Sequence, residues 1–285
     1  MKQNRRSFIK TGTTAVAGAI AASPFLTAAS DAGYKLNKFG LITWWADDAM
    51  KSDWKGTLAK AAKFGFSEIE GGSSNADSPK QFLKFCREIG LKPIAGGAGG
   101  LGEMVENIQK YLDECSELNY KYMVVYWPWL HNGPFKLDDC KKSAELLNRI
   151  GEKAQKQELQ FLWHNHDKEF HEMEDGLPFD YLMQHTDPEL VNCEMDIYWV
   201  KKGGSEPLQY LKKYAGRYPM LHVKDMAPGN EQDFACPGLG IIDFVPIFRE
   251  AKNQEIKHYI VERDNEPNEM ECLESSAKFL KSIHF

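Results

Sequence analysis

The chain has 285 residues, of which 42% are hydrophobic and 27% charged, and its formal net charge is −6 at pH 7. That length suffices for one large domain, because a (β/α)₈ barrel needs roughly 250 residues. The acidic balance argues against a nucleic-acid partner, since gripping a phosphate backbone requires clustered basic residues. The cysteines contain no C-x-x-C pair, which disfavours a zinc ribbon and leaves disulfide pairing open. They are Cys86, Cys115, Cys140, Cys193, Cys236 and Cys272.

Residues 1–30 are predicted to be an export signal that is removed from the mature protein. Arg5 and Arg6 form a twin arginine ahead of an apolar stretch over 13–22, and small residues follow over 27–30. The apolar stretch is too short and too rich in Thr and Gly to span a membrane, and it lacks the polar face of an amphipathic helix. The signal carries four basic residues and no acidic one, so the mature charge becomes −10. We therefore expect a periplasmic protein, exported by the twin-arginine route and free of the membrane after cleavage.

The rest of the chain alternates short apolar runs with longer stretches of helical period. The predicted strands are Phe39–Trp45, Ser67–Gly71, Lys92–Ala95, Tyr122–Trp127, Leu159–His164, Val191–Asp196, Met220–Lys224 and His258–Glu262. The predicted helices are Asp48–Phe64, Pro79–Ile89, Leu101–Leu118, Leu137–Gln157, Pro178–His185, Glu206–Tyr214, Phe244–Lys252 and Met270–Ser282. Strict alternation of strand and helix implies right-handed crossovers within one parallel sheet. Eight such units without a linker predict a single-domain (β/α)₈ TIM barrel over residues 31–285.

Polar residues collect at the carboxyl ends of these strands, where the active site of such a barrel lies. Strands five to eight end in His164, Asp196, His222 and Glu262. Each residue alone could be a helix cap or a structural carboxylate, but one ion explains four adjacent strand ends together. Two imidazoles and two carboxylates form a mixed nitrogen and oxygen ligand set that suits transition metals better than Ca²⁺. The expected cofactor is one divalent ion, with Mn²⁺, Zn²⁺, Co²⁺ and Mg²⁺ as candidates.

Several segments resemble signature segments of the xylose-isomerase-like sugar phosphate isomerase/epimerase superfamily. They are Trp163–Phe170, Met195–Val200, Leu221–Met226, Pro237–Phe244 and Tyr259–Asp264. The resemblance implies a divalent ion held at the ends of strands five to eight by Glu, Asp, His and Glu. Asp196, His222 and Glu262 match that pattern, whereas His164 stands where the first Glu would be, as in the HNH-bearing branch. That departure puts a two-glutamate epimerisation in doubt, and Trp199 replaces a substrate-binding His of the family.

A divalent ion bound to a sugar carbonyl would lower the pKa of the adjacent C–H and stabilise an enediolate. The candidate proton carriers are Glu262, His166 and Lys224. A nearby ion would lower the pKa of Lys224, although Lys224 could instead pair with Asp225 or Glu262, and His166 could instead orient a loop. Further residues near the predicted mouth are candidates for binding the substrate, and the tryptophans among them could also fill the barrel. They are Trp45, Glu70, Trp127, Trp199 and Arg263.

The leading functional hypothesis is a divalent-metal-dependent sugar isomerase or epimerase that acts through a metal-stabilised enediolate. The expected substrate is a non-phosphorylated sugar or sugar derivative, because the sequence offers no phosphate cradle. One alternative is a lyase or dehydratase acting on a keto-sugar of the inosose or 3-keto-glycoside type. Another, of a different class, is a metal-containing sugar-binding protein without turnover. Homo-oligomers are compatible with the sequence, and a nuclease of the related endonuclease branch is disfavoured by missing ligands and by net charge.

Overall fold

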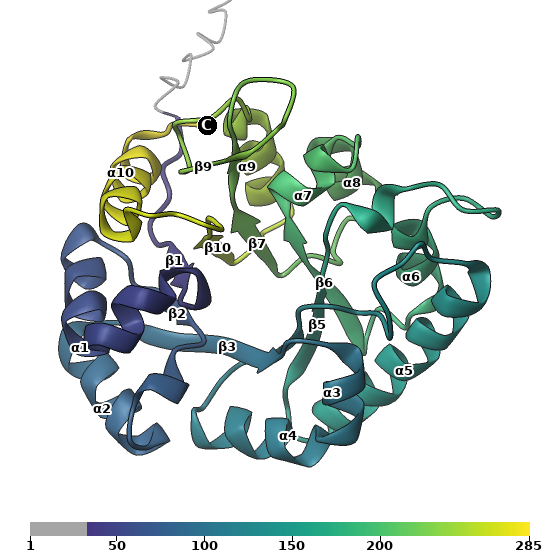
Figure 1. Ribbon diagram of the computed structural model, residues 1–285, viewed down its shortest axis with the longest axis horizontal. Helices are drawn as coiled ribbons and strands as arrows, with labels where there is room; N and C mark the ends of the chain where they lie inside the picture. Colours follow the sequence, from purple (N-terminus) through teal and green to yellow (C-terminus); the bar gives the residue numbers. More distant parts are fainter. Residues whose placement is uncertain (1–32) are drawn as a thin grey trace, which may run out of the picture. The chain divides into compact units, whose positions relative to one another are not determined.

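The computed structural model describes residues 33–285, so the predicted export signal lies outside the described residues. Eight parallel strands close a barrel in the order β1-β10-β7-β6-β5-β4-β3-β2, and the helices surround it (Figure 1). This confirms the predicted barrel. The barrel strands are β1 (Gly40–Ile42), β2 (Glu68–Glu70), β3 (Lys92–Ala98), β4 (Tyr122–Val125), β5 (Gln160–His164), β6 (Val191–Asp196), β7 (Met220–Val223) and β10 (His258–Val261).

Ten α-helices connect the described strands or follow them. They are α1 (Asp47–Phe64), α2 (Pro79–Ile89), α3 (Leu101–Glu106), α4 (Ile108–Glu117), α5 (Leu137–Gln155), α6 (Pro178–His185), α7 (Ile197–Lys202), α8 (Pro207–Lys213), α9 (Phe244–Asn253) and α10 (Glu269–Ser282). The single helix predicted over 101–118 is interrupted at Asn107, and α7 was not predicted. None of the described helices is long and apolar enough to cross a membrane.

Local sequence signals explain where these elements begin and end. Ser78 caps α2 by accepting a hydrogen bond from the backbone N–H of Gln81, and Pro79 opens the helix where a missing N–H costs least. Gly90 ends α2 with φ at 79°, a left-handed conformation that glycine adopts without steric cost. The barrel strands themselves are almost wholly buried, as in β4, because helices cover the outside and side chains fill the inside.

A buried polar cluster, which we call the base cluster, lies at the amino-terminal ends of the strands. His258 begins β10, and its two ring nitrogens lie 2.8 Å from Glu68 Oε2 and 3.1 Å from the Tyr122 hydroxyl. Lys38 Nζ donates to the other oxygen of Glu68 at 2.6 Å. Each charged group in the cluster thus has an opposite charge or a hydrogen-bond partner, which is what burial of polar groups requires.

A short hairpin and a disulfide complete the upper part of the barrel near β10. The hairpin pairs β8 (Asp225–Met226) with β9 (Phe234–Ala235), and neither strand was predicted. Cys236, directly after β9, is bonded to Cys272 in α10 across a separation of 36 residues. The pairing that the sequence left open therefore joins two cysteines that flank β10, while Cys86, Cys115, Cys140 and Cys193 are free and buried.

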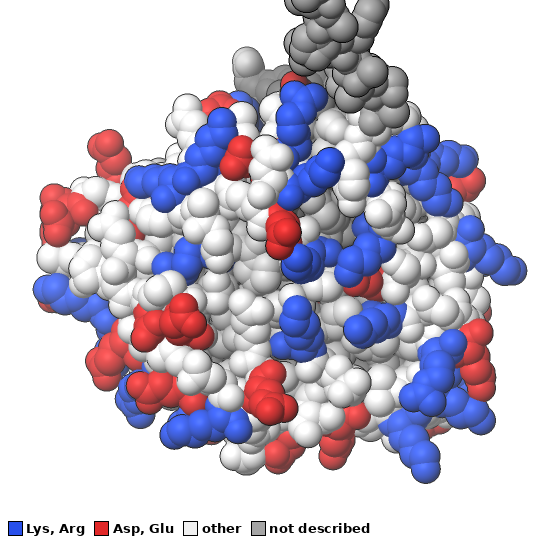
Figure 2. Space-filling model, turned by 180° about the vertical axis from the view of Figure 1, so that it is seen from behind, with Lys and Arg blue, Asp and Glu red and all other residues white. Residues whose placement is uncertain are grey.

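Acidic and basic side chains are interspersed on the face of the molecule opposite to that of Figure 1 (Figure 2). Mixed charges of this kind keep a surface soluble without creating the single-sign field that attracts a polyelectrolyte.

Candidate active site

The four predicted metal ligands lie together at the carboxyl ends of their strands, and we call them the upper cluster. They are His164 at the end of β5, Asp196 at the end of β6, His222 in β7 and Glu262 directly after β10. One nitrogen or oxygen atom from each lies within 4.8 Å of the others. All four residues are at least 97% buried.

Strand alternation and one loop asparagine fix the position of Asp196. In β6 the side chains of Asn192, Glu194 and Asp196 share one side of the strand, because successive side chains point to opposite faces. Asn165 accepts from the Asp196 backbone N–H at 3.0 Å and donates to its carbonyl at 3.3 Å. Asp196 Oδ1 caps α7 by accepting from Trp199 N at 2.9 Å, so only Oδ2 remains for another partner.

His222 is held between carboxylates on both sides of its ring. Its Nδ1 lies 2.7 Å from Glu262 Oε2, and its Nε2 lies 3.0 Å from Glu194 Oε1 and 3.1 Å from Glu70 Oε2. Burial lowers the pKa of His222, but Glu194, Glu70 and Glu262 together raise it well above the ordinary value. This arrangement suits a ligating imidazole whose far nitrogen is oriented by a carboxylate.

The remaining oxygen of Asp196 gives a test of whether the upper cluster fits a metal ion. Asp196 Oδ2 is buried and has no hydrogen-bond partner among the described residues. Burial raises the pKa of this carboxyl to about 7, because an ionised oxygen without a partner is costly in the interior. His164 Nε2 lies 3.8 Å away. A divalent cation held by His164, Asp196, His222 and Glu262 would remove that cost, so the residues fit the expected cofactor.

Lys224 is a fully buried cation beside the upper cluster. Its Nζ lies 2.8 Å from Asp264 Oδ2, 3.3 Å from Glu262 Oε2 and 3.5 Å from Asp196 Oδ2. Burial lowers the pKa of Lys224, but these carboxylates raise it above the ordinary value. The lowering expected from a bound ion stays a prediction. Of the two partners suggested for Lys224, Glu262 is in contact.

Asp225, the other suggested partner of Lys224, has a different role. Its carboxylate accepts hydrogen bonds from four backbone N–H groups at 2.8 to 3.1 Å. Three of these amides belong to the loop after β9, and they are those of Gly238, Gly240 and Ile242. Asp225 therefore anchors this loop beside the mouth of the barrel.

His166 lies on the wall of the cavity above the upper cluster. Its ring centroid is 5.2 Å from that of Trp127 and 5.3 Å from that of Trp199. Its backbone N–H donates to Glu169 Oε2 at 2.9 Å, while its buried Nδ1 has no partner among the described residues. Burial and, next, the charge of Lys224 lower the pKa of His166 to about 3, so its imidazole is neutral and can accept a hydrogen bond.

The predicted substrate-binding residues differ in how close they lie to the cavity. Trp127 lines the cavity, and Trp199 packs against His166 and lies under Lys224 Nζ, 5.0 Å from its ring centroid. Glu70 is buried beneath the cavity, where it contacts His222 and accepts from the Tyr126 hydroxyl at 2.6 Å. Arg263 does not line the cavity, because it pairs with Glu266 at 2.9 Å. The side chain of Trp45 lies outside the described part of the structure.

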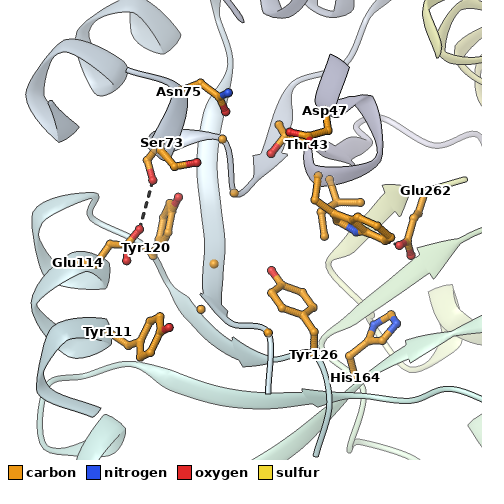
Figure 3. A pocket seen from close by; sticks show the side chains of 18 of the residues that line it. Thr43, Asp47, Ser73, Asn75, Tyr111, Glu114, Tyr120, Tyr126, His164 and Glu262 are labelled. Atoms are coloured by element: carbon orange, nitrogen blue, oxygen red, sulfur yellow. Dashed lines mark hydrogen bonds between the residues drawn. The ribbon is translucent and has the colours of Figure 1, made fainter. Parts of the chain in front are cut away.

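Trp44, rather than its neighbour, makes the described contact with the upper cluster. Its Nε1 donates to Glu262 Oε1 at 3.0 Å, and its ring forms part of the cavity wall. The cavity has a volume of about 600 Å³ and reaches from His164 and Glu262 toward β2, β3 and α4 (Figure 3). The mouth of the barrel thus combines a cluster of ionisable groups with aromatic walls, as small-molecule sites do.

Sequence reasoning missed two residues that support this site. Glu194 lies 3.2 Å from His164 Nδ1, and Tyr126 connects Glu70 to the cavity. A signal for Glu194 was present, because it stands two residues before Asp196 in the same strand and must share its side of the sheet. Tyr126 follows β4 directly and could have been read as one more strand end.

Comparison with known proteins gives the family. A model of the xylose isomerase-like TIM barrel matches residues 58–283. The chain belongs to this family. An inosose dehydratase from Bacillus cereus (strain AH820) is 29% identical over 215 residues, which cover 63% of this chain and 70% of that protein.

Solved structures show the same fold. A sugar phosphate isomerase/epimerase from Parabacteroides distasonis ATCC 8503 has a TM-score of 0.74 and 24% identity, covering 92% of this chain and 98% of that one. The IOLI protein with a binding zinc atom has a TM-score of 0.70 and 16% identity, covering 87% of this chain and 99% of that one. At these identities the likeness extends to the barrel itself and no further.

Proposed function

We propose that this member of the xylose isomerase-like family is a divalent-metal-dependent lyase that acts on a non-phosphorylated keto-sugar. The substrate would be of the inosose or 3-keto-glycoside type. The observation that carries the proposal is the composition of the upper cluster where it faces the cavity. Of the two carboxylates in the upper cluster, Glu262 lines the cavity and Asp196 does not. His164 stands where a two-glutamate epimerase would have its second glutamate. The similarity to inosose dehydratase supports the same class of reaction.

A single carboxylate suffices for elimination on one face of a sugar ring. Glu262 would remove the proton next to the carbonyl, and the C–H electron pair would form a carbon–carbon double bond as the neighbouring C–O bond breaks. Glu262 would then deliver the same proton to the departing oxygen, so that water or an alcohol leaves and the atoms balance. Inversion of a stereocentre instead needs proton carriers on both faces.

Other side chains of the site support this proton transfer by Glu262. Burial raises the pKa of Glu262, but Lys224 and His222 together hold it well below its usual range, so the carboxylate is ionised. Trp44 fixes its other oxygen. The neutral His166 would contact a substrate oxygen from the opposite wall. An ion held by the upper cluster would supply Lewis acidity, which stabilises negative charge developing on a sugar carbonyl oxygen.

The test uses purified protein loaded with Mn²⁺ or Zn²⁺ in deuterated water, with an inosose and a 3-keto-glucoside as substrates. The expected result is metal-dependent release of water or aglycone with formation of an unsaturated ketone, followed by ultraviolet absorbance and mass spectrometry. Deuterium in recovered substrate or in its isomer, without an eliminated product, would overturn elimination and favour the sugar isomerase or epimerase.

The single carboxylate also permits that second candidate, because one base can return a proton to the neighbouring carbon in an aldose–ketose isomerisation. Sugar binding without exchange or release, retained in Glu262→Ala, would instead favour a binding protein. A non-phosphorylated substrate agrees with the proposed export to the periplasm through the twin-arginine signal, since sugar phosphates are scarce outside the cytoplasm.

A further inference from the structure

The cavity extends well past the upper cluster into a polar arm. The arm lies between the loop after β2 and helix α4, on the side of Tyr126 away from His164 and Glu262 (Figure 3). Its polar lining includes Ser73, Asn75, Lys110, Tyr111, Glu114 and Tyr120. None of these residues belongs to the upper cluster or contacts it in the hydrogen bonds described above.

Tyr120 presents an unused donor to this arm. The residue is 7% exposed, and its hydroxyl makes no hydrogen bond of good geometry among the described residues, although the Ser73 side chain lies close enough to lower its pKa. The nearby Ser73 hydroxyl donates instead to Glu114 Oε1 at 3.2 Å. Burial raises the pKa of Tyr120, so the phenol stays protonated. A buried donor without a partner is costly to maintain, and a ligand oxygen in the arm would satisfy it.

Glycines of β3 leave room for Tyr120 beside the arm. A Cβ atom on Gly96 would lie 2.6 Å from the Tyr120 ring, and one on Gly97 would lie 1.8 Å from the carbonyl oxygen of Val124. No larger residue fits at either position without moving its neighbour. The Tyr120 ring is therefore packed directly on Gly96.

The volume of the cavity exceeds the volume that one sugar ring would occupy. If each of the twelve non-hydrogen atoms of a hexose took as much space as a water molecule in the liquid, about 30 Å³, the hexose would fill about 360 Å³. The cavity holds about 600 Å³. The arm is lined by phenols, a hydroxyl, an amide, an ammonium and a carboxylate, which match sugar hydroxyls and suit an apolar group poorly.

We propose that the arm is a subsite for a second sugar unit, so that the substrate is a disaccharide or a sugar-linked glycoside rather than a free monosaccharide. This inference rests on the proposed function, because it takes the reacting ring to lie at the upper cluster. Tyr120 donates to a hydroxyl of the second unit, and Glu114 accepts from another. Tyr126 lies at the junction of the two subsites.

The test measures binding by calorimetry to the full protein loaded with Mn²⁺. The ligands are glucose, 3-keto-glucose and a panel of glucosyl-glucoses that differ in linkage. We expect at least one disaccharide to bind about tenfold or more tightly than either monosaccharide. Tyr120→Phe and Glu114→Gln should each weaken that disaccharide about fivefold to tenfold and leave monosaccharide binding unchanged. The matched controls Tyr181→Phe, in α6, and Glu117→Gln, exposed in α4, should change neither affinity.

Each other outcome counts against the subsite. Monosaccharide binding without any gain from a second unit overturns it and leaves the proposed lyase standing. If Tyr120→Phe weakens the binding of monosaccharides and disaccharides equally, the Tyr120 hydroxyl contacts the reacting ring, and this result also overturns the subsite. If the metal-loaded protein binds neither class, both the proposed function and the subsite fall. A circular-dichroism melt of each variant identifies any that fails to fold, and the remaining variant then decides.

Discussion

The two ends of the barrel bury the same kinds of ionisable side chains, but the charges are balanced at one end and in excess at the other. In the base cluster, His258 lies between Glu68 and Tyr122, and Lys38 neutralises the second carboxylate oxygen. In the upper cluster and its surroundings, His222 is likewise fixed by carboxylates, but acids outnumber bases. The acids there are Glu70, Glu194, Asp196, Glu262 and Asp264, and the bases are His164, His222 and Lys224.

The contrast shows that residue types alone do not separate a structural cluster from a reactive one. Both ends contain a buried His–Glu contact shorter than 3 Å. Among the described residues, buried carboxylate oxygens without a hydrogen-bond partner occur only at the upper end, where negative charge is in excess, and they are Glu194 Oε1, Asp196 Oδ2 and Asp264 Oδ1. Counting partners atom by atom identifies the end at which a cation is needed.

The largest expected difference between the two ends concerns activity. Glu262→Gln should reduce kcat about 10³-fold, because the variant loses both the proposed proton carrier and an anionic metal ligand. Glu68→Gln, a matched change in the base cluster, should keep kcat within about threefold while lowering the melting temperature. Steady-state kinetics and thermal melts of both variants check this. Equal loss of activity in the two variants would contradict the division of roles.

Breaking the base cluster should have the largest effect on stability. His258→Leu leaves Glu68 and Tyr122 buried without their shared partner, and a buried polar group that loses its hydrogen-bond partner typically costs about 1–3 kcal/mol. We expect that loss in the free energy of urea unfolding, with unchanged affinity for Mn²⁺. A metal affinity that falls along with stability would mean that the two ends are coupled.

Metal addition should act on the upper end alone. Mn²⁺ or Zn²⁺ at 100 times its Kd should stabilise the chelator-treated protein by about 2.7 kcal/mol, because a ligand that binds the folded state shifts the equilibrium. Differential scanning fluorimetry measures the shift in melting temperature. Asp196→Asn should abolish most of the shift, whereas Glu68→Gln should keep it. A full shift in Asp196→Asn would exclude that residue as a ligand.

The smallest expected effect is a pH dependence from the base cluster. Burial raises the pKa of Glu68, but His258 and Lys38 together lower it by more, so the folded-state pKa lies below the ordinary 4.5. The stability that the ionised Glu68 contributes is therefore present above pH 4.5 and is lost as pH falls through the folded-state pKa. Urea unfolding from pH 7 to pH 3 should show a shallower decline for Glu68→Gln than for the wild type. Parallel curves would contradict this.

The fold and the ligand positions followed from the sequence for a common reason. A covered parallel strand is rich in apolar residues, and a polar residue at its carboxyl end, such as His164 in β5 or Asp196 in β6, falls at the mouth of the barrel. The contacts of Arg263 and Glu70 did not follow, because they depend on which side of a loop or strand faces a neighbour. The helix α7 was missed because its six residues are too few to establish a helical period.

Asp225 has a consequence for redesign of the molecule. The loop after β9 is secured through its own backbone amides and through Gly238 and Gly240, where a Cβ would clash with Phe279 and with Asp225. Leu239 and Ile241 within it are 66% and 55% exposed. These two positions can therefore be randomised in a library while Asp225 preserves the path of the chain.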